Sequence, residues 1–220
     1  DIPAESQVKK DLNFVEENFS GIMPLEIEVD LQTKRSRPLQ NLKIAKKIDE
    51  FELSLDSISL ASRPISILSF IKASRQAYYN NNPEWYALPT SDIEAKYVLG
   101  YLKGQTDNSG LFNSFVDSTY QRMRISMQMA DIGSIRLDSL VNHVIEPRAA
   151  KLVTELKKTL RSESDSVKVT VTGSSKIFIK GNKFLIENLT ESLILACILI
   201  TLSMAILFAN ARMILISLVP

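Results

Sequence analysis

The chain has 220 residues, of which 45% are hydrophobic, and its 26 basic and 25 acidic residues leave a net charge of +1. This apolar content is enough for a core and excludes a disordered protein, with room for one soluble domain of about 185 residues. Neither charge sign forms long blocks, which argues against a nucleic-acid partner because phosphate binding needs a concentrated basic face.

The first half of the chain predicts one βαβ unit over residues 23–61. An amphipathic helix is expected before it, over residues 5–19. Residues 24–31 alternate apolar with acidic side chains, which is typical of a strand with one buried face. Pro38 suits the first turn of the helix that follows, and residues 57–61 predict a second, short strand.

Residues 62–118 predict a helical insertion between two regular halves. An apolar helix is expected over residues 65–79, and the polar run N-N-N-P at 80–83 ends it. The sequence S-D-I-E at 91–94 is typical of a capping box and predicts the start of another helix. A turn is expected at residues 106–110.

The second half predicts another βαβ unit over residues 119–172. Residues 119–130 alternate as a long strand, and an apolar stripe from Leu137 to Leu160 predicts a long helix. Pro147 should kink that helix or split it in two. Alternating valines at 167–171 predict the last strand.

Two βαβ units in one domain predict an α+β fold, a ferredoxin-like split βαβ sandwich. In that fold a four-stranded antiparallel sheet packs two helices against one face. Right-handed crossovers leave few other economical arrangements.

The C-terminal part predicts a transmembrane helix. Residues 192–209 contain no charge and would span about 27 Å at about 1.5 Å per residue, so we assign residues 189–209 to the membrane. A buried core helix is the alternative. Residues 173–188 form a junction without a flexible linker, which would transmit motion. Residues 210–220 predict a cytoplasmic turn and the start of a further membrane segment, so we expect the chain to be a fragment.

Residues suited to catalysis or metal binding are few and scattered. His143 and Cys197 are the only histidine and cysteine, and no phosphate-binding, nucleophile-elbow or zinc motif occurs. The sequence therefore predicts no catalytic residue, no metal site, no cofactor and no enzymatic activity. His143 is expected at a helix surface, and a pH-sensing role remains open.

Two groups of side chains are candidates for contact with an apolar ligand. The first is the methionine face of the strand at 119–130: Met123, Met127 and Met129. The second is the aromatic group near the polar break: Tyr78, Tyr79, Trp85 and Tyr86. Methionine adapts to irregular apolar surfaces, although such a face is also typical of a plain core. Exposed aromatic rings are costly without a partner or lipid headgroups beside them.

Motifs across most of the chain resemble exporters of the resistance-nodulation-division superfamily, nearest to the branch of mycobacterial membrane protein large and hydrophobe/amphiphile efflux transporters. The resemblance rests on these stretches: D-I-P-A-E-S-Q-V at residues 1–8, F-V-E-E-N-F-S-G-I-M-P-L-E-I-E-V-D at 14–30, I-S-M-Q-M-A-D-I-G at 125–133, V-T-G-S-S-K-I-F-I-K-G-N-K-F-L-I-E-N-L-T-E-S-L-I-L-A at 171–196, and M-A-I-L-F-A-N-A-R-M-I-L-I-S-L-V-P at 204–220. The last stretch departs from the family, which often has a basic residue where this chain has Ala209.

The resemblance implies a periplasmic porter domain over residues 1–188, in the C-terminal half of a transporter of the bacterial inner membrane. It also implies proton-driven export of hydrophobic or amphiphilic molecules or lipids. The implied partners are membrane lipids, the substrate and the other porter half. Proton-relay residues would lie in other helices, since residues 192–209 contain no ionisable side chain of that kind. A sensor domain that signals through a membrane helix, or a structural subunit of a membrane complex, are the alternatives.

Overall fold

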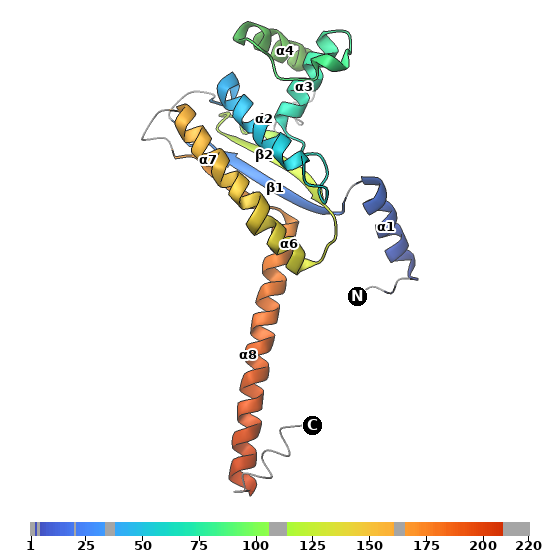
Figure 1. Cartoon of the computed structure of the whole chain (residues 1–220), viewed down its shortest axis with the longest axis vertical. Helices are drawn as coiled ribbons and strands as arrows, with labels where there is room; N and C mark the ends of the chain where they lie inside the picture. Colours follow the sequence, from blue (N-terminus) through green and yellow to red (C-terminus); the bar gives the residue numbers. More distant parts are fainter. Residues whose placement is uncertain are drawn as a thin grey trace. The chain divides into compact units, whose positions relative to one another are not determined.

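A mixed α+β domain and a long apolar C-terminal helix make up the structure (Figure 1). The computed structural model describes residues 3, 5–19, 21–33, 38–105, 114–160 and 166–208. Two compact units divide between Ile177 and Phe178. The turn predicted at 106–110 and the membrane segment predicted at 210–220 lie outside the described residues.

Three antiparallel strands form the sheet of the first unit, in the order β2-β1-β3. The strands are β1 (Met23–Asp30), β2 (Arg122–Met129) and β3 (Lys168–Thr172). Ile27 of the central strand lies opposite Ile125 on one side and Val171 on the other. The three strands predicted at 24–31, 119–130 and 167–171 are confirmed.

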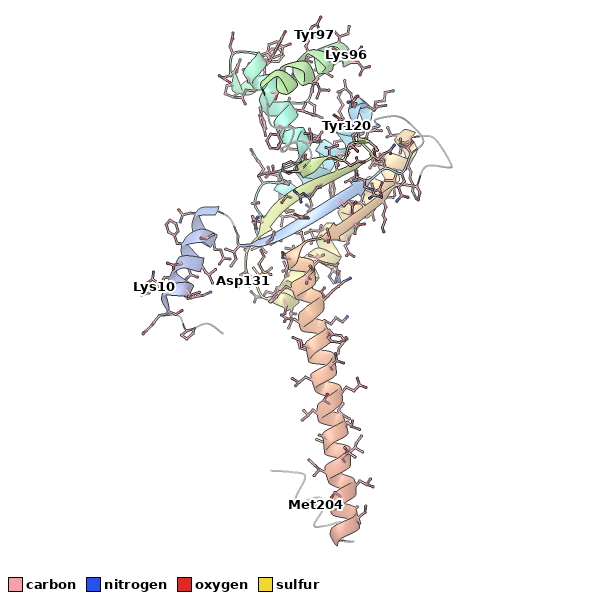
Figure 2. The ribbon with its side chains drawn as sticks, turned by 180° about the vertical axis from the view of Figure 1, so that it is seen from behind. Lys10, Lys96, Tyr97, Tyr120, Asp131 and Met204 are labelled. Carbon is pink, nitrogen blue, oxygen red and sulfur yellow. The ribbon has the colours of Figure 1, made fainter. Side chains whose placement is uncertain are left out.

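The sheet has one apolar and one polar face because its side chains alternate. Leu25, Ile27 and Val29 are fully buried, as is Ile125 on β2. The opposite face, seen in Figure 2, carries the cross-strand ion pairs Arg122–Asp30 at 3.0 Å and Arg124–Glu26 at 3.5 Å. The apolar face therefore has to be covered by helices.

Helices α2 (Leu42–Asp56) and α7 (Glu146–Leu160) supply that cover and lie side by side on one face of the sheet (Figure 1). Each presents a buried apolar stripe. The buried hydrophobic residues of the two stripes are Ile44, Ala45, Ile48, Phe51 and Leu55 of α2, and Ala149, Leu152, Leu156 and Leu160 of α7.

A π-helical turn (Val141–Ile145) joins α6 (Ser134–Leu140) to α7. It directly precedes Pro147, where the sequence predicts a kink or a break. Proline has no N–H to donate, and its ring clashes with the carbonyl four residues earlier, so the preceding turn widens. The Glu146 N–H accordingly bonds to the Val141 carbonyl.

The predicted helical insertion contains α3 (Ile67–Tyr78), a 3₁₀ turn η2 (Pro83–Trp85) and α4 (Asp92–Gln105). Helix α3 packs against α4 and contacts β2 at a few positions. Asn80 and Asn81 both have left-handed backbone, with φ of 57° and 59°, as a chain reversal between these helices requires.

The strand predicted at 57–61 is wrong, and the described residues form three strands instead of four. Ala61 and Ile65 make isolated bridges to Met129 and Ser126 of β2. Pro64, between them, has no N–H to give to a ladder, so pairing does not continue along this segment.

One expectation at a helix start also needs correction. Pro38 opens a separate 3₁₀ turn, η1 (Pro38–Gln40), and α2 begins at Leu42 with Asn41 as its cap. Helix α1 (Gln7–Phe19) forms as predicted, but its stripe is not buried, since Val8 is 59% and Val15 38% exposed. The Glu16 carboxylate accepts a hydrogen bond from the Asp131 N–H at 2.8 Å.

Helix α8 (Ser174–Phe208) has 35 residues and starts earlier than predicted. Gly173, with φ of +100°, precedes it, and a Cβ there would lie 2.9 Å from backbone atoms of Pro24 and Glu26. The junction predicted at 173–188 is therefore helical from its second residue.

Candidate functional site

A small apolar cavity lies among α2, α3 and α4. Its volume is about 50 Å³, and its lining includes Leu42 of α2, Ile67 and Ile71 of α3, and Leu99 of α4. An apolar cavity of about 150 Å³ holds a benzene molecule, so this one is too small for an amphiphile as it stands. Separation of the α3–α4 layer from α2 would enlarge it.

A second hollow of about 300 Å³ lies between α2 and α3 and is lined by charged side chains. Lys72 of α3 forms an ion pair with Asp49 of α2, and these side chains are only 11% and 20% exposed. Arg63 pairs with Asp56 at 3.5 Å. These two pairs leave Glu52 as the lining carboxyl without a cation of its own.

Glu52 is the most deeply buried acidic residue of this hollow, with 4% exposure. Its Oε1 atom has no hydrogen-bond partner among the described residues. Burial raises the pKa of Glu52 to about 7, while the Ser66 hydrogen bond and the Lys72 charge act in the opposite direction and the Asp49 charge adds to the rise. The carboxyl therefore changes its protonation near neutral pH.

Helix α4 is tied to α3 by a buried ion pair. The Arg75 Nε atom lies 2.6 Å from Glu94 Oε1, with side-chain exposures of 6% and 12%. The pKa of Glu94 is lowered although burial opposes this, because the Thr90 N–H and hydroxyl and Arg75 all donate to the carboxylate. The predicted capping box is half present: the Ser91 hydroxyl accepts from the Glu94 N–H, but the Glu94 side chain turns to Thr90 and Arg75.

The four predicted aromatic residues gather at the end of α3 and around η2. Tyr79 and Trp85 stack with ring centroids 4.0 Å apart, and Tyr78 meets Tyr79 edge-on at 5.2 Å. Arg75 lies over the Trp85 ring at 4.8 Å, and the Lys72 Nζ atom lies 6.0 Å from the Tyr86 ring. Tyr78 and Tyr86 are 46% and 40% exposed, so they are the members open to a ligand.

The predicted methionine group lies elsewhere, in the core between the sheet and its helices. Met123, Met127 and Met129 are 1%, 2% and 0% exposed. These side chains are therefore not open to a ligand at the surface of this structure. The structure thus separates the two candidate groups, and the methionines pack as core residues here.

The described residues contain no group of three or more His, Cys, Asp or Glu side chains placed to hold a metal ion. His143 is exposed on the π-helical turn, and its Nδ1 atom lies 3.0 Å from the Ser139 carbonyl oxygen. Cys197 is a free, exposed cysteine of α8.

One helix of the described chain, α8, is long and apolar enough to cross a membrane. Its side chains stand out all around it, as Figure 2 shows for Met204 and its neighbours. Leu193, Leu199 and Leu202 are each more than half exposed. The Ser192 and Thr201 hydroxyls donate to carbonyls four residues earlier, which satisfies these polar groups within the helix.

Sequence reasoning missed two features of this site. Glu52 lies four residues after Ile48 and three before Leu55, which places it on the apolar stripe of α2, and that position was the available signal. The Arg75–Glu94 pair joins residues 19 positions apart, for which no local pattern exists. The chain matches no protein-family model and no curated protein, so its function is argued from these residues alone.

Proposed function

We propose that this chain is the extracytoplasmic porter domain and following membrane helix of a proton-driven transporter that resembles the resistance-nodulation-division superfamily. It would export hydrophobic or amphiphilic molecules or lipids from the bacterial inner membrane, with residues 1–188 in the periplasm. Helix α8 carries the proposal, because its charge-free part exposes leucine and isoleucine on all sides. Such a surface is stable in lipid and costly in water.

The order of elements in the first unit supports a ferredoxin-like porter fold. The central β1 pairs antiparallel with β2 and β3, and α2 and α7 cover the same face. The bridges of Ala61 and Ile65 lie on β2, where the second strand of a split βαβ fold would pair. We assign the segment that makes these bridges as a shortened form of this second strand, which would complete the four-stranded sheet.

The α3–α4 layer is the part of the domain that suits substrate contact. It offers the apolar cavity beside α2, and Tyr78 and Tyr86 are its exposed aromatic side chains near η2. An aromatic surface next to Lys72 and Arg75 suits a molecule with an apolar body and a polar end. The proposal includes no catalytic step, and its partners are membrane lipids, the substrate and the other porter half.

The membrane assignment can be tested with the single cysteine. A membrane-impermeant maleimide should leave Cys197 unlabelled in intact vesicles and should label it after the helix is dissolved in detergent under denaturing conditions. A Cys197→Ser, Ser57→Cys variant provides the control, because Ser57 is exposed on the first unit. Rapid labelling of Cys197 in intact vesicles would contradict the membrane assignment.

The transport assignment can be tested in the full-length protein with the fluorescent amphiphile N-phenyl-naphthylamine as the probe. Tyr78→Ala and Tyr86→Ala should each slow its export about fivefold, as expected from the loss of about 1 kcal/mol of aromatic contact. Tyr97→Ala is the matched control, since Tyr97 is 64% exposed on α4 (Figure 2) and is not one of the four residues of the aromatic group. Absence of any energy-dependent export by the unaltered protein would overturn the assignment.

A further inference from the structure

The interface between α2 and α3 differs from the rest of the core because it contains charged groups. Lys72, Asp49 and Glu52 are all buried or nearly so, and they line one hollow. A buried carboxyl is stable without a cation only in its protonated form. The state of Glu52 therefore bears directly on how firmly α3 packs against α2.

The groups around Glu52 come from each segment that meets there. Asp49 and Asp56 lie on α2, Arg63 and Ser66 lie on the loop before α3, Lys72 lies on α3, and Tyr86 lines the hollow from the segment after η2. Lys72 is already engaged by Asp49, and Arg63 by Asp56. The far side of α2 faces α7, where Arg148 donates to Ser54 and Ser57 and Lys47 lies 4.0 Å from Glu155. None of these cations pairs with Glu52.

We propose that the Glu52 carboxyl is a proton-sensitive latch that holds the α3–α4 layer against α2 while protonated and releases this layer on ionisation. Ionised Glu52 competes with Asp49 for Lys72 and draws water in through the hollow. Arg75 and Glu94 keep α4 attached to α3, so both helices move together. This opening would also widen the apolar cavity beside α2, but the latch is a property of the fold and does not depend on transport.

Proton linkage fixes the size of the expected effect. In an opened state the hydrated carboxyl regains its ordinary pKa near 4.5, whereas in the closed state the pKa is about 7. Opening should therefore become about tenfold more favourable between pH 6 and pH 8. Opening becomes less favourable still as pH falls from 6 to about 4.5.

The single tryptophan, Trp85, reports on this layer, because it ends η2, the turn between α3 and α4, and stacks on Tyr79. In the full chain in detergent micelles, its fluorescence should change with pH with a midpoint near 7. Glu52→Gln, which imitates the protonated carboxyl, should remove the transition. Lys72→Met should move the midpoint to higher pH, since the Lys72 charge favours the ionised carboxyl. Circular dichroism at pH 6 checks that each variant is folded.

His143 is the only histidine and provides the matched control, because it lies on the π-helical turn and not in the hollow that contains Glu52. His143→Ala should keep the transition. No transition in the unaltered chain, its loss in His143→Ala, its persistence in Glu52→Gln, or an unmoved midpoint in Lys72→Met would each overturn the latch.

Hydrogen exchange tests the latch without any substitution. The protection of α3 amides relative to α7 amides should fall about tenfold from pH 6 to pH 8, and the ratio cancels the ordinary pH dependence of exchange. An unchanged ratio would overturn the proposal even where export by the full-length protein is normal.

Discussion

Helix α2 meets α7 on one side and α3 on another, and the chemistry of the two interfaces differs. Toward α7 it presents Phe51, which lines one hollow together with Leu152 of α7, while the side chains of the ion pair between Lys47 and Glu155 are about a third exposed at the rim. Toward α3 it presents Asp49 and Glu52, which are largely withdrawn from water. The first interface is held by burial of apolar surface, and the second depends on charge.

This difference determines how each interface responds to its surroundings. Burial of apolar surface does not change with proton concentration, whereas a buried carboxyl is tolerated only in one protonation state. The α2–α7 layer should therefore behave as a fixed support for the sheet across neutral pH. The α2–α3 layer should loosen as pH rises, so the same helix joins a constant and an adjustable part of the domain.

The largest effect is expected from Leu156→Ala, which removes a fully buried side chain of α7. The free energy of unfolding should fall by about 3 kcal/mol, within the range of about 2–5 kcal/mol for such changes. Urea denaturation followed by circular dichroism at pH 6 and pH 8 should give the same loss. Lys157→Ala, at the exposed neighbouring position, is the control, and a loss that depends on pH would contradict the comparison.

An effect of similar or smaller size is expected from Glu52→Gln, and it should depend on pH. Because the folded-state pKa of about 7 lies above the ordinary value of 4.5, the carboxyl costs no stability below pH 4.5. The cost grows as pH rises to about 7 and is constant above that. The free energy of unfolding of the variant should exceed that of the unaltered chain by up to about 3 kcal/mol at pH 8 and should equal it at pH 4.5. Equal free energies of unfolding for the variant and the unaltered chain at both pH values would show that Glu52 does not make the α2–α3 interface sensitive to pH.

The smallest effect is expected from Glu155→Gln at the rim of the α2–α7 interface. Glu155 lies 4.0 Å from Lys47 and 3.1 Å from Lys158, and the three side chains are about a third or more exposed. Water and salt screen such pairs, so the urea midpoint should not change within error. A clear loss that disappears in high salt would show that charge also holds the α2–α7 layer.

The strands and helices with strict periodicity could be predicted from the sequence. Residues 24–31 and 119–130 alternate so regularly that each needs one buried face, and both form strands. Whether residues 57–61 form a strand could not be predicted in the same way. Their pairing depends on Pro64, which has no N–H to donate, and on which backbone groups of β2 they meet in the fold. The helical form of residues 174–188 was also missed, since their apolar and charged residues follow no clear stripe.

The candidate site was only partly predictable. Tyr79 and Trp85 come together because a short polar reversal joins their segments, so nearness in sequence was enough. The burial of Met123 and its neighbours depends on α2 and α7, which arrive from distant parts of the chain. Glu52 was overlooked because a carboxylate on a helix is ordinarily solvated, and its environment is set by α3.

The π-helical turn at Val141–Ile145 keeps the buried residues of α6 and α7 on one face. Leu137, Val141, Ile145 and Ala149 follow one another at intervals of four and are all buried. In a regular α-helix each residue turns by about 100°, so repeated steps of four drift away from one face. The π-helical turn holds about one residue more than an α-helical turn, so each residue in it rotates the chain by less and the steps of four stay on one face. Deletion of a residue there would turn Leu137 about 100° away from the core while α7 stayed in place.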